Sequence, residues 1–327
     1  MASPQLQHYV PRFILRRFRT AAQDAVHVYD KHAGRGFVAS TGKVGAEKGL
    51  YDFEFDGEGL TLESGLAEIE GRAAQQLDQI LKDGHLHPAN ALERSELAQF
   101  FAVQLVRTPA HREMWREFEA RMEAHLRREG MREDFFAIDP RLGSRENADH
   151  ALIVETVMNA PEHFAPALIA KDWLLMRTDS ACSYTIGDHP LVMHNVRDHG
   201  LRGNLGLNVR GIEIYFPLSP RLMLGMMCES HRRDFESGLR HMSRENRRDP
   251  RLQKGLSIAR DFIHAVRSGQ PASMDPQNVE FLNSLQVARA ERFLFSCEGN
   301  FSLAERMIAA NPHLRRGRRI EEATGKF

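Results

Sequence analysis

The residues best suited to chemistry in this chain are polar side chains that helical periodicity turns inward. Residues 60–82 read as a long helix with an apolar stripe, formed by Leu62, Leu66, Ile69, Ala73, Leu77 and Ile80. Glu63 and Glu70 stand seven residues apart, so they lie about 20° apart around the helix axis, at the margin of that stripe. Carboxylates placed this way can act as a general base or as ligands of a divalent cation.

A second helical run, residues 93–129, turns further polar side chains inward. Its apolar side is formed by Leu97, Phe100, Phe101, Trp115, Phe118 and Met122. Gln104, Thr108 and His111 fall within the same arc. Arg107 falls at its edge, and Pro109 predicts a kink or a break in the run. Because an unpaired polar group costs roughly 1–3 kcal/mol to bury, these side chains require partners.

Two interpretations of these facing residues are open. The connection 83–92 is short enough for an antiparallel helix pair, so Glu70 and Arg107 can form a salt bridge that holds the helices in register. Alternatively, the inward residues line a polar cavity for a ligand or a metal ion, formed by Glu63, Glu70, Gln104 and His111. The metal ligands are then Glu63, Glu70 and His111, and the cofactor is a divalent cation, although no Glu-x-x-His or His-Glu-x-x-His spacing occurs.

Asp188 is a further candidate for acid–base chemistry. It follows a strand-like segment and Gly187, and it precedes His189 and Pro190. A carboxylate on a sharp turn at a strand end is within reach of a ligand. The alternative is that Gly-Asp-x-Pro is a structural turn in which Asp188 accepts hydrogen bonds from backbone N–H groups.

The N-terminal segment supplies a third group. Pro11 predicts the first turn of a short helix over residues 12–18. His8 then lies at the start of this helix and Arg12 one turn in, where its guanidinium can hold anionic oxygens. The alternative is an ordinary N-terminal arm that packs Phe13 and Leu15 on the body of the protein.

The composition excludes several classes of protein. Basic and acidic residues balance at 44 each, which argues against a dedicated nucleic-acid binder and leaves a local basic groove open. No apolar run reaches the roughly 18–20 residues of a membrane-spanning helix, and residues 1–19 contain no signal-peptide core. We therefore expect a cytoplasmic protein with no membrane partner. The glycine motifs of common hydrolases, NTPases and dehydrogenases are also absent.

The order of elements predicts an α+β fold, helix-rich overall, with long antiparallel helices and a short antiparallel sheet. Helices are expected at residues 12–18, 60–82, 93–129, 148–159, 249–266 and 276–292. Strands are expected at 26–30, 173–177, 212–216, 222–226 and 293–296, and on both sides of residues 187–190. We expect one large domain over residues 1–327, divided into an N-terminal helical part (1–165), a sheet with helices (166–300) and a basic tail (312–327).

The segment from His8 to Phe18 resembles the opening of a large, mostly bacterial family known only as a domain of unknown function, whose members begin His-x-Val-Pro-x-Phe-Leu-Leu-x-x-Phe. Later blocks are similar to that family at residues 62–70, 104–109, 185–190, 217–220 and 283–296, with Gly187 where the family usually has serine. The resemblance spans most of residues 5–300 and implies no activity. Its motif positions include His8, Glu70, Gln104, Arg107 and Asp188, which implies that these residues converge in one site.

The leading functional hypothesis is a metal-dependent hydrolase acting on a phosphate-containing or nucleotide-like small molecule. Arg12, Gln104 and Arg107 would bind the substrate, and the catalytic residues would be Glu70, Asp188 and His8. The alternative is a non-catalytic ligand- or protein-binding protein of regulation or defence, in which the polar cluster is a structural network. The sequence leaves the oligomeric state and a nucleic-acid partner open.

Overall fold

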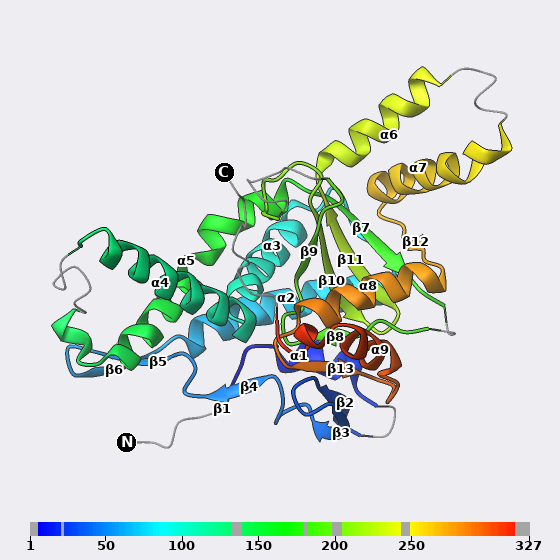
Figure 1. Ribbon diagram of the computed structural model, residues 1–327. Coiled ribbons are helices and arrows are strands. Elements are labelled where there is room, and N and C mark those ends of the chain that lie inside the picture. The colour runs from blue at the N-terminus through cyan, green and yellow to red at the C-terminus, as the bar shows by residue number, and fades with distance from the viewer. Residues whose placement is uncertain are drawn as a thin grey trace.

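The computed structural model describes residues 6–20, 23–131, 139–179, 182–197, 205–242 and 249–317. At its centre lies a five-stranded sheet with strand order β12-β7-β11-β10-β9 (Figure 1). Its strands are β12 (Ala272–Ser273), β7 (Asp172–Arg177), β11 (Leu222–Met227), β10 (Glu213–Ser219) and β9 (Val192–His194). The pairs among β7, β11, β10 and β9 are antiparallel, and β12 joins β7 in parallel. The predicted hairpin of residues 212–216 and 222–226 is confirmed by β10 and β11.

Alternation along the strands gives this sheet two apolar faces and divides the core in two. One face packs against α3 (Ala91–Val106), where the ring of Phe101 lies 5.9 Å from that of Trp173 and 4.9 Å from that of Phe216. The other face carries Leu174, Met176, Tyr215, Met223 and Met227, and it packs against α7 (Pro250–Ser268) and α8 (Pro276–Arg289). The two cores therefore share one sheet.

Helix α3 is the most deeply buried helix among the described residues. Every residue from Phe100 to Thr108 is buried, which explains why this stretch has no polar face. Helices α2 (Glu63–Asp83) and α5 (Arg145–Ile169) flank α3, as Figure 1 shows. Any polar side chain on the second half of α3 has to find its partners inside the protein.

The predicted helical run 93–129 is broken at Arg107 and Thr108, and the break corrects one expectation. Helix α4 (Pro109–Arg128) begins in a new direction, with Thr108 as its N-cap. The second half of the predicted buried face is therefore exposed: Trp115, Phe118 and Met122 retain 41–42% of their surface. Proline at the first helical position is compatible with a new helix and not with continuation of the old one.

The N-terminal and C-terminal parts of the chain meet in a second sheet, with strand order β3-β2-β13-β8. Its strands are β3 (Arg35–Ser40), β2 (Ala25–Asp30), β13 (Phe293–Ser296) and β8 (Ile186–Gly187). Helices α8 and α9 (Ser302–Ala310) pack against it. Nearby, β1 (Leu6–His8) pairs with β4 (Ala46–Lys48), α1 (Arg12–Leu15) continues as a 3-10 turn (Arg16–Phe18), and β5 (Asp52–Phe55) forms a hairpin with β6 (Glu58–Thr61).

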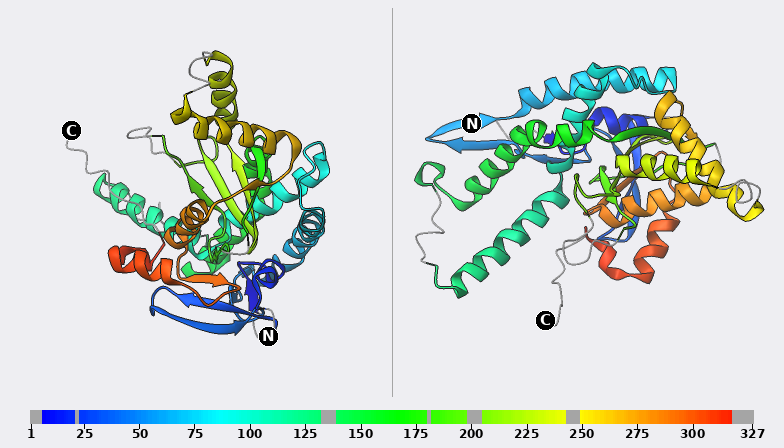
Figure 2. Two further views of the ribbon diagram at one scale, coloured as in Figure 1. Left: turned by 90° about the vertical axis from the view of Figure 1, so that its right-hand side faces the viewer. Right: turned by 90° about the horizontal axis from the view of Figure 1, so that it is seen from above.

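The α+β, helix-rich class predicted from the sequence is confirmed. Helix α5 is longer than the predicted 148–159 because it continues through Pro161 and Pro166. Two helices, α6 (Glu229–His241) and α9, are absent from the prediction, and α6 is so rich in charged residues that its apolar face is reduced to Phe235 and Leu239. Figure 2 shows that α6 and α7 extend together beyond the sheet. None of the helices in the described ranges is long and apolar enough to cross a bilayer.

We predict that Gly269→Ala lowers the free energy of unfolding by about 1–3 kcal/mol. Gly269 has φ +74°, and an added Cβ would overlap the carbonyl oxygen of Leu86, whose N–H donates to the Gly269 carbonyl oxygen at 2.9 Å. Urea denaturation followed by circular dichroism measures the change. The control is Gly71→Ala, at an exposed position inside α2 with open space around it. This control should raise the free energy of unfolding by roughly 0.5–1 kcal/mol. Equal effects of the two substitutions would contradict the close approach at Gly269.

Candidate functional site

Arg107 caps the C-terminus of α3, and its side chain is fully buried. Its Nη1 donates to Glu70 Oε1 on α2 at 2.7 Å, while Nε and Nη2 donate to Gln104 Oε1 at 2.9 and 2.7 Å. Gln104 is itself buried, and its Nε2 donates to the carbonyl oxygen of Tyr9 at 2.8 Å. These contacts join α2, α3 and the N-terminal segment. The Glu70–Arg107 contact is the interhelical salt bridge of the first interpretation, and the side-chain amide of Gln104 extends it.

The outer edge of this network carries the other predicted residues. The side chain of Glu70 keeps 26% of its surface exposed. His8 Nε2 lies 3.3 Å from the Thr41 carbonyl oxygen, and burial lowers the pKa of His8 while the nearby Glu70 carboxylate raises it. Glu63 is exposed at the start of α2, and desolvation together with the neighbouring Glu70 carboxylate raises the pKa of its carboxyl group. The structure thus brings His8, Glu63 and Glu70 to the side of the buried Arg107.

Arg12 is near this group but engaged elsewhere. Its Nη2 donates to Asp24 Oδ2 at 2.8 Å, and its Nε to Thr41 Oγ1 at 3.5 Å. The side chain of Arg12 is 45% exposed. Its charge is therefore compensated by Asp24 at the surface.

Asp188 is buried and binds backbone amides. It accepts hydrogen bonds from the N–H groups of Glu291, Arg292 and Phe293 at 2.6, 2.7 and 2.8 Å. Burial raises the pKa of Asp188 to about 6, against the lowering effect of the three amides. Among the described residues, no hydrogen bond or ion pair joins Asp188 to His8, Glu70 or Arg107. Asp188 therefore fastens the end of β8 to the start of β13, as the turn interpretation expects.

His111 is separated from the Glu70 network and faces a cavity of about 370 Å³. This histidine pocket lies where α4 begins, between α5, α8 and β9. Its apolar walls are formed by Leu105, Val106, Phe164, Met193, Leu205 and Leu207. Its polar groups include His111, His189 and Arg289. An apolar pocket with a few convergent polar groups is the usual form of a small-molecule site.

The Thr108 hydroxyl connects the two histidines of the pocket. Thr108 Oγ1 lies 2.6 Å from His189 Nδ1 and accepts from the His111 N–H at 3.4 Å. A hydroxyl has one proton to donate and two lone pairs that accept, so this contact is compatible with either tautomer of the neutral His189 imidazole. In the tautomer that receives the Thr108 proton at Nδ1, the ring proton of His189 is on Nε2 and is available beyond this contact.

Both imidazoles are uncharged at neutral pH. Burial lowers the pKa of His189 to about 3, and the neighbouring His111 and Arg289 contribute to the lowering. Burial also lowers the pKa of His111. The pocket therefore offers neutral imidazole groups next to the positive charge of Arg289.

Two residues of this pocket, His189 and Arg289, were not among the predicted site residues. His189 directly follows the candidate Asp188 in the Gly-Asp-His-Pro turn. The turn was therefore recognised as a possible site, but its aspartate was chosen as the functional residue. Nothing in the local sequence distinguishes Arg289, because only the packing of α8 against the end of β9 brings it there.

The predicted metal ligands are not brought together. Within the part of the chain that the structure describes, no three His, Cys, Asp or Glu side chains are grouped so that they could hold a metal ion. Glu63 and Glu70 lie on α2, whereas the change of direction at Thr108 turns His111 toward the histidine pocket. The prediction that Glu63, Glu70 and His111 bind one metal ion is therefore corrected. The two carboxylates lie beside Arg107, and the imidazole of His111 lies in the histidine pocket.

We predict that Glu70→Gln destabilises the protein by about 1–3 kcal/mol, because it removes the charge that compensates the buried Arg107. Glu68→Gln is the matched control on the same helix, since the Glu68 side chain is 72% exposed and pairs with Arg72. The control should change stability by less than about 0.5 kcal/mol. Urea denaturation of both variants measures the difference. A Glu70→Gln variant as stable as the control would contradict a stabilising role for this ion pair.

We also predict a pH dependence of stability that arises from His189. Its pKa falls from 6.5 in the unfolded chain to about 3 in the folded protein, so the unfolded state binds the proton more readily between these values. The contribution is complete above pH ~6.5 and is lost as the pH falls toward ~3. His189→Gln should therefore show a smaller drop in Tm between pH 7.5 and 5.5 than the unsubstituted protein. The exposed His313 provides the control, because His313→Gln should leave the drop unchanged.

Comparison with known proteins gives a family and no activity. Neither the curated proteins nor the solved structures contain a match to this chain. A protein-family model matches residues 6–300, a range that includes the N-terminal segment, the Arg107 network, the histidine pocket and the two larger sheets. The chain therefore belongs to the family described as Protein of unknown function (DUF4238).

Proposed function

We propose that this protein binds a small organic anion in the histidine pocket, and that the Glu70–Arg107 network is structural. The observation that carries the proposal is the composition of the pocket: neutral His111 and His189 beside Arg289, within apolar walls. This is the ligand-binding alternative of the sequence analysis, moved to a different group of residues.

The chemistry of the pocket favours a ligand with an apolar body and an anionic end. The apolar side chains of Phe164, Leu205 and Leu207 favour a hydrophobic or flat body. The guanidinium of Arg289 favours anionic oxygens, as does His189 in the tautomer that carries its proton on Nε2, since hydrogen bonds to charged acceptors are the stronger ones. A nucleotide-like molecule belongs to this class. We propose that the protein binds its ligand in the cytoplasm.

The burial of the other predicted residues supports a structural role for them. Arg107 is fully buried and donates to Glu70 and Gln104, so a ligand cannot reach its guanidinium. Asp188 is also buried, and its carboxylate accepts from three backbone amides. A general base needs access to the proton that it abstracts, and this access is missing at Asp188.

The test uses anilinonaphthalene sulfonate, a fluorescent probe with an apolar body and one anionic group. We predict saturable binding of one probe molecule per chain, weakened about tenfold, or ~1.4 kcal/mol, by Arg289→Met. Arg306→Met is the matched control, because Arg306 lies on α9 with 61% of its side chain exposed. Fluorescence titration at neutral pH gives the affinities. Adenosine monophosphate and benzoate, added as competitors, then test the nucleotide-like and simple aromatic members of the class.

A second variant keeps this test decisive if Arg289→Met fails to fold. Ala110 lines the pocket, and Ala110→Phe fills it while leaving Arg289 and both histidines in place. This variant should abolish probe binding and retain cooperative unfolding. Full-strength binding to Ala110→Phe, or equal weakening by Arg306→Met, would refute the proposed location of the site.

The predicted hydrolase is a second candidate, and one contact favours it. The Thr108 hydroxyl and the His189 imidazole lie within hydrogen-bond distance beside the pocket, as a nucleophile and its base do. It ranks second because an imidazole whose pKa is about 3 is a weak base at neutral pH. Release of nitrophenol from nitrophenyl phosphate, with and without Mg²⁺, tests it. Turnover that is lost in Thr108→Val would favour the hydrolase over the binding protein.

A further inference from the structure

A second cavity, of about 600 Å³, lies on the other face of the five-stranded sheet. Strands β7, β10 and β11 form its floor, and residues of α6 and α7 contribute to its walls. Figures 1 and 2 show that these two helices extend beyond the sheet. It shares no lining residue with the histidine pocket. An inference about this arm cavity therefore stands independently of the proposed function.

The floor of the arm cavity combines a carboxylate with apolar side chains. Glu213 and Tyr215 are two residues apart on β10, so both side chains stand on the same face of the sheet. Across the strand pair, Gly225 lies opposite Tyr215, and the methyl groups of Met176 and Met227 lie over this glycine. Without a side chain at position 225, two flexible thioether side chains supply the surface of the floor.

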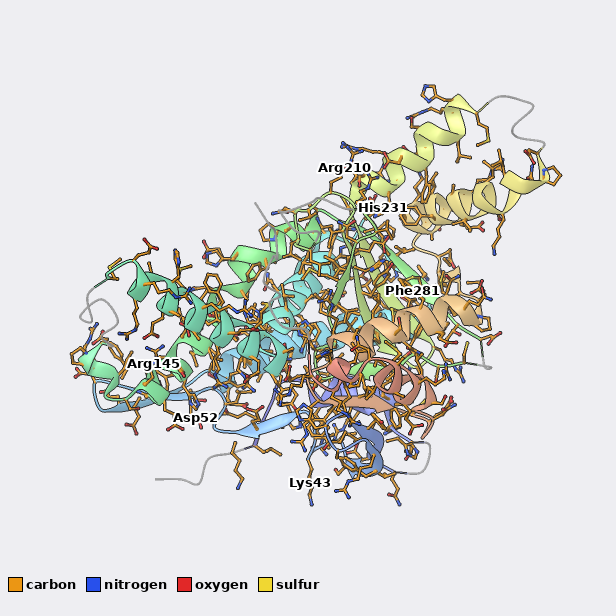
Figure 3. The ribbon with its side chains drawn as sticks, in the orientation of Figure 1. Lys43, Asp52, Arg145, Arg210, His231 and Phe281 are labelled. Carbon is orange, nitrogen blue, oxygen red and sulfur yellow. The ribbon has the colours of Figure 1, made fainter. Side chains whose placement is uncertain are left out.

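The carboxylate of Glu213 is held in place by a tyrosine and approached by a histidine. The Tyr215 hydroxyl donates to Glu213 Oε2 at 2.9 Å, and burial raises the pKa of Tyr215 well above its ordinary value, so the hydroxyl remains a donor. His231 Nε2 lies 3.0 Å from the Gly211 carbonyl oxygen and 3.7 Å from Glu213 Oε1. Because a carbonyl only accepts, the Nε2 proton is directed to Gly211. Figure 3 marks His231 where α6 leaves the sheet.

The Asp and Glu side chains that line the arm cavity are not balanced by lysine or arginine among its described lining residues. Of the described residues that line it, the carboxylates are Glu213 and Asp261, and none is lysine or arginine. The nearby arginines of α6 and α7 are paired outside the cavity: Arg232 with Asp172 at 2.9 Å and Arg267 with Glu236 at 2.9 Å. These ion pairs fix α6 to β7 and to α7. They leave the interior acidic in a protein whose basic and acidic residues are equal in number.

The walls of the arm cavity suit a cation with an apolar body. Phe235 of α6 and Phe262 of α7 meet edge to face, with ring centroids 5.3 Å apart. Aromatic faces attract ammonium groups, by roughly 0.5–2 kcal/mol depending on desolvation, and thioethers pack adaptably against alkyl chains. The Glu213 side chain is 18% exposed, and a half-buried carboxylate that faces such walls favours an organic cation over a neutral or anionic molecule.

We propose that the arm cavity is a binding site for an organic ammonium ion, with its nitrogen at Glu213 and its apolar body against Phe235, Phe262 and the floor methionines. The ligand class is an alkyl or aryl amine in its protonated form. The site differs from the histidine pocket in the sign of the charge that it selects. The protein thus has separate sites for cationic and anionic organic molecules.

The test compares phenethylamine, which is protonated at neutral pH, with phenethyl alcohol, which has nearly the same shape and no charge. Isothermal titration calorimetry on the full chain should show one amine bound per chain, at least tenfold tighter than the alcohol. Glu213→Gln should weaken amine binding at least tenfold and leave alcohol binding unchanged. Glu280→Gln is the matched control, because Glu280 lies on α8 with a 57% exposed side chain that pairs with Arg306. It should bind the amine as the unsubstituted protein does.

A further variant guards against misfolding of Glu213→Gln. Ala272 of β12 lines the arm cavity, and Ala272→Phe should exclude both compounds while the protein still unfolds cooperatively. Equal affinities for amine and alcohol would overturn the proposal, as would amine binding that survives both Glu213→Gln and Ala272→Phe. Absence of amine binding to the folded protein at millimolar concentration would also overturn it.

Discussion

A guanidinium that is removed from water has to be neutralised and hydrogen-bonded by its neighbours, and much of this protein is arranged around that requirement at Arg107. The residue is fully buried at the end of α3. Glu70 supplies the opposite charge from α2, and Gln104 accepts from two guanidinium nitrogens while donating to the Tyr9 backbone. One charge thus determines how two helices and the N-terminal segment are placed. Removing one partner of a buried pair is costly, which makes the arrangement mutually dependent.

The same point of the chain determines where the histidine pocket forms. Helix α3 ends at Val106, two residues before Thr108, and the threonine begins α4 by accepting from the His111 amide. Its hydroxyl then binds His189, which follows the buried Asp188 in the turn after β8. Asp188 in turn fastens that turn to the start of β13 by three amide contacts. The predicted site residues Arg107 and Asp188 are therefore buried behind the pocket wall, and their chain neighbours Val106 and His189 line the cavity.

The five-stranded sheet separates two environments of opposite character. On one side, α3 and the aromatic core lead to the pocket with neutral imidazoles and Arg289. On the other side, the acidic arm cavity lies beneath α6 and α7. Residues two apart on a strand share a face, so a single strand contributes Phe216 to the aromatic core and Glu213 and Tyr215 to the arm cavity. The alternation along β10 therefore separates the aromatic core from the arm cavity.

Local chemistry in the sequence determined the class of fold, most helices, the β10–β11 hairpin, the family, and the pairing of Glu70 with Arg107. These features depend on periodicity, turn residues and the cost of burying a charge, all of which act over a few residues or between adjacent helices. The tertiary structure alone decided that Trp115 and Phe118 are exposed, that His111 faces away from Glu70, and that Arg289 joins His189 across the chain. A helical wheel assumes one straight helix axis. Because the chain changes direction at Thr108, the wheel of α3 does not apply to the residues of α4. The arm cavity also could not be predicted from the sequence, because Glu213 and His231 line a common space only when α6, a helix whose apolar face is reduced to Phe235 and Leu239, is placed against the sheet.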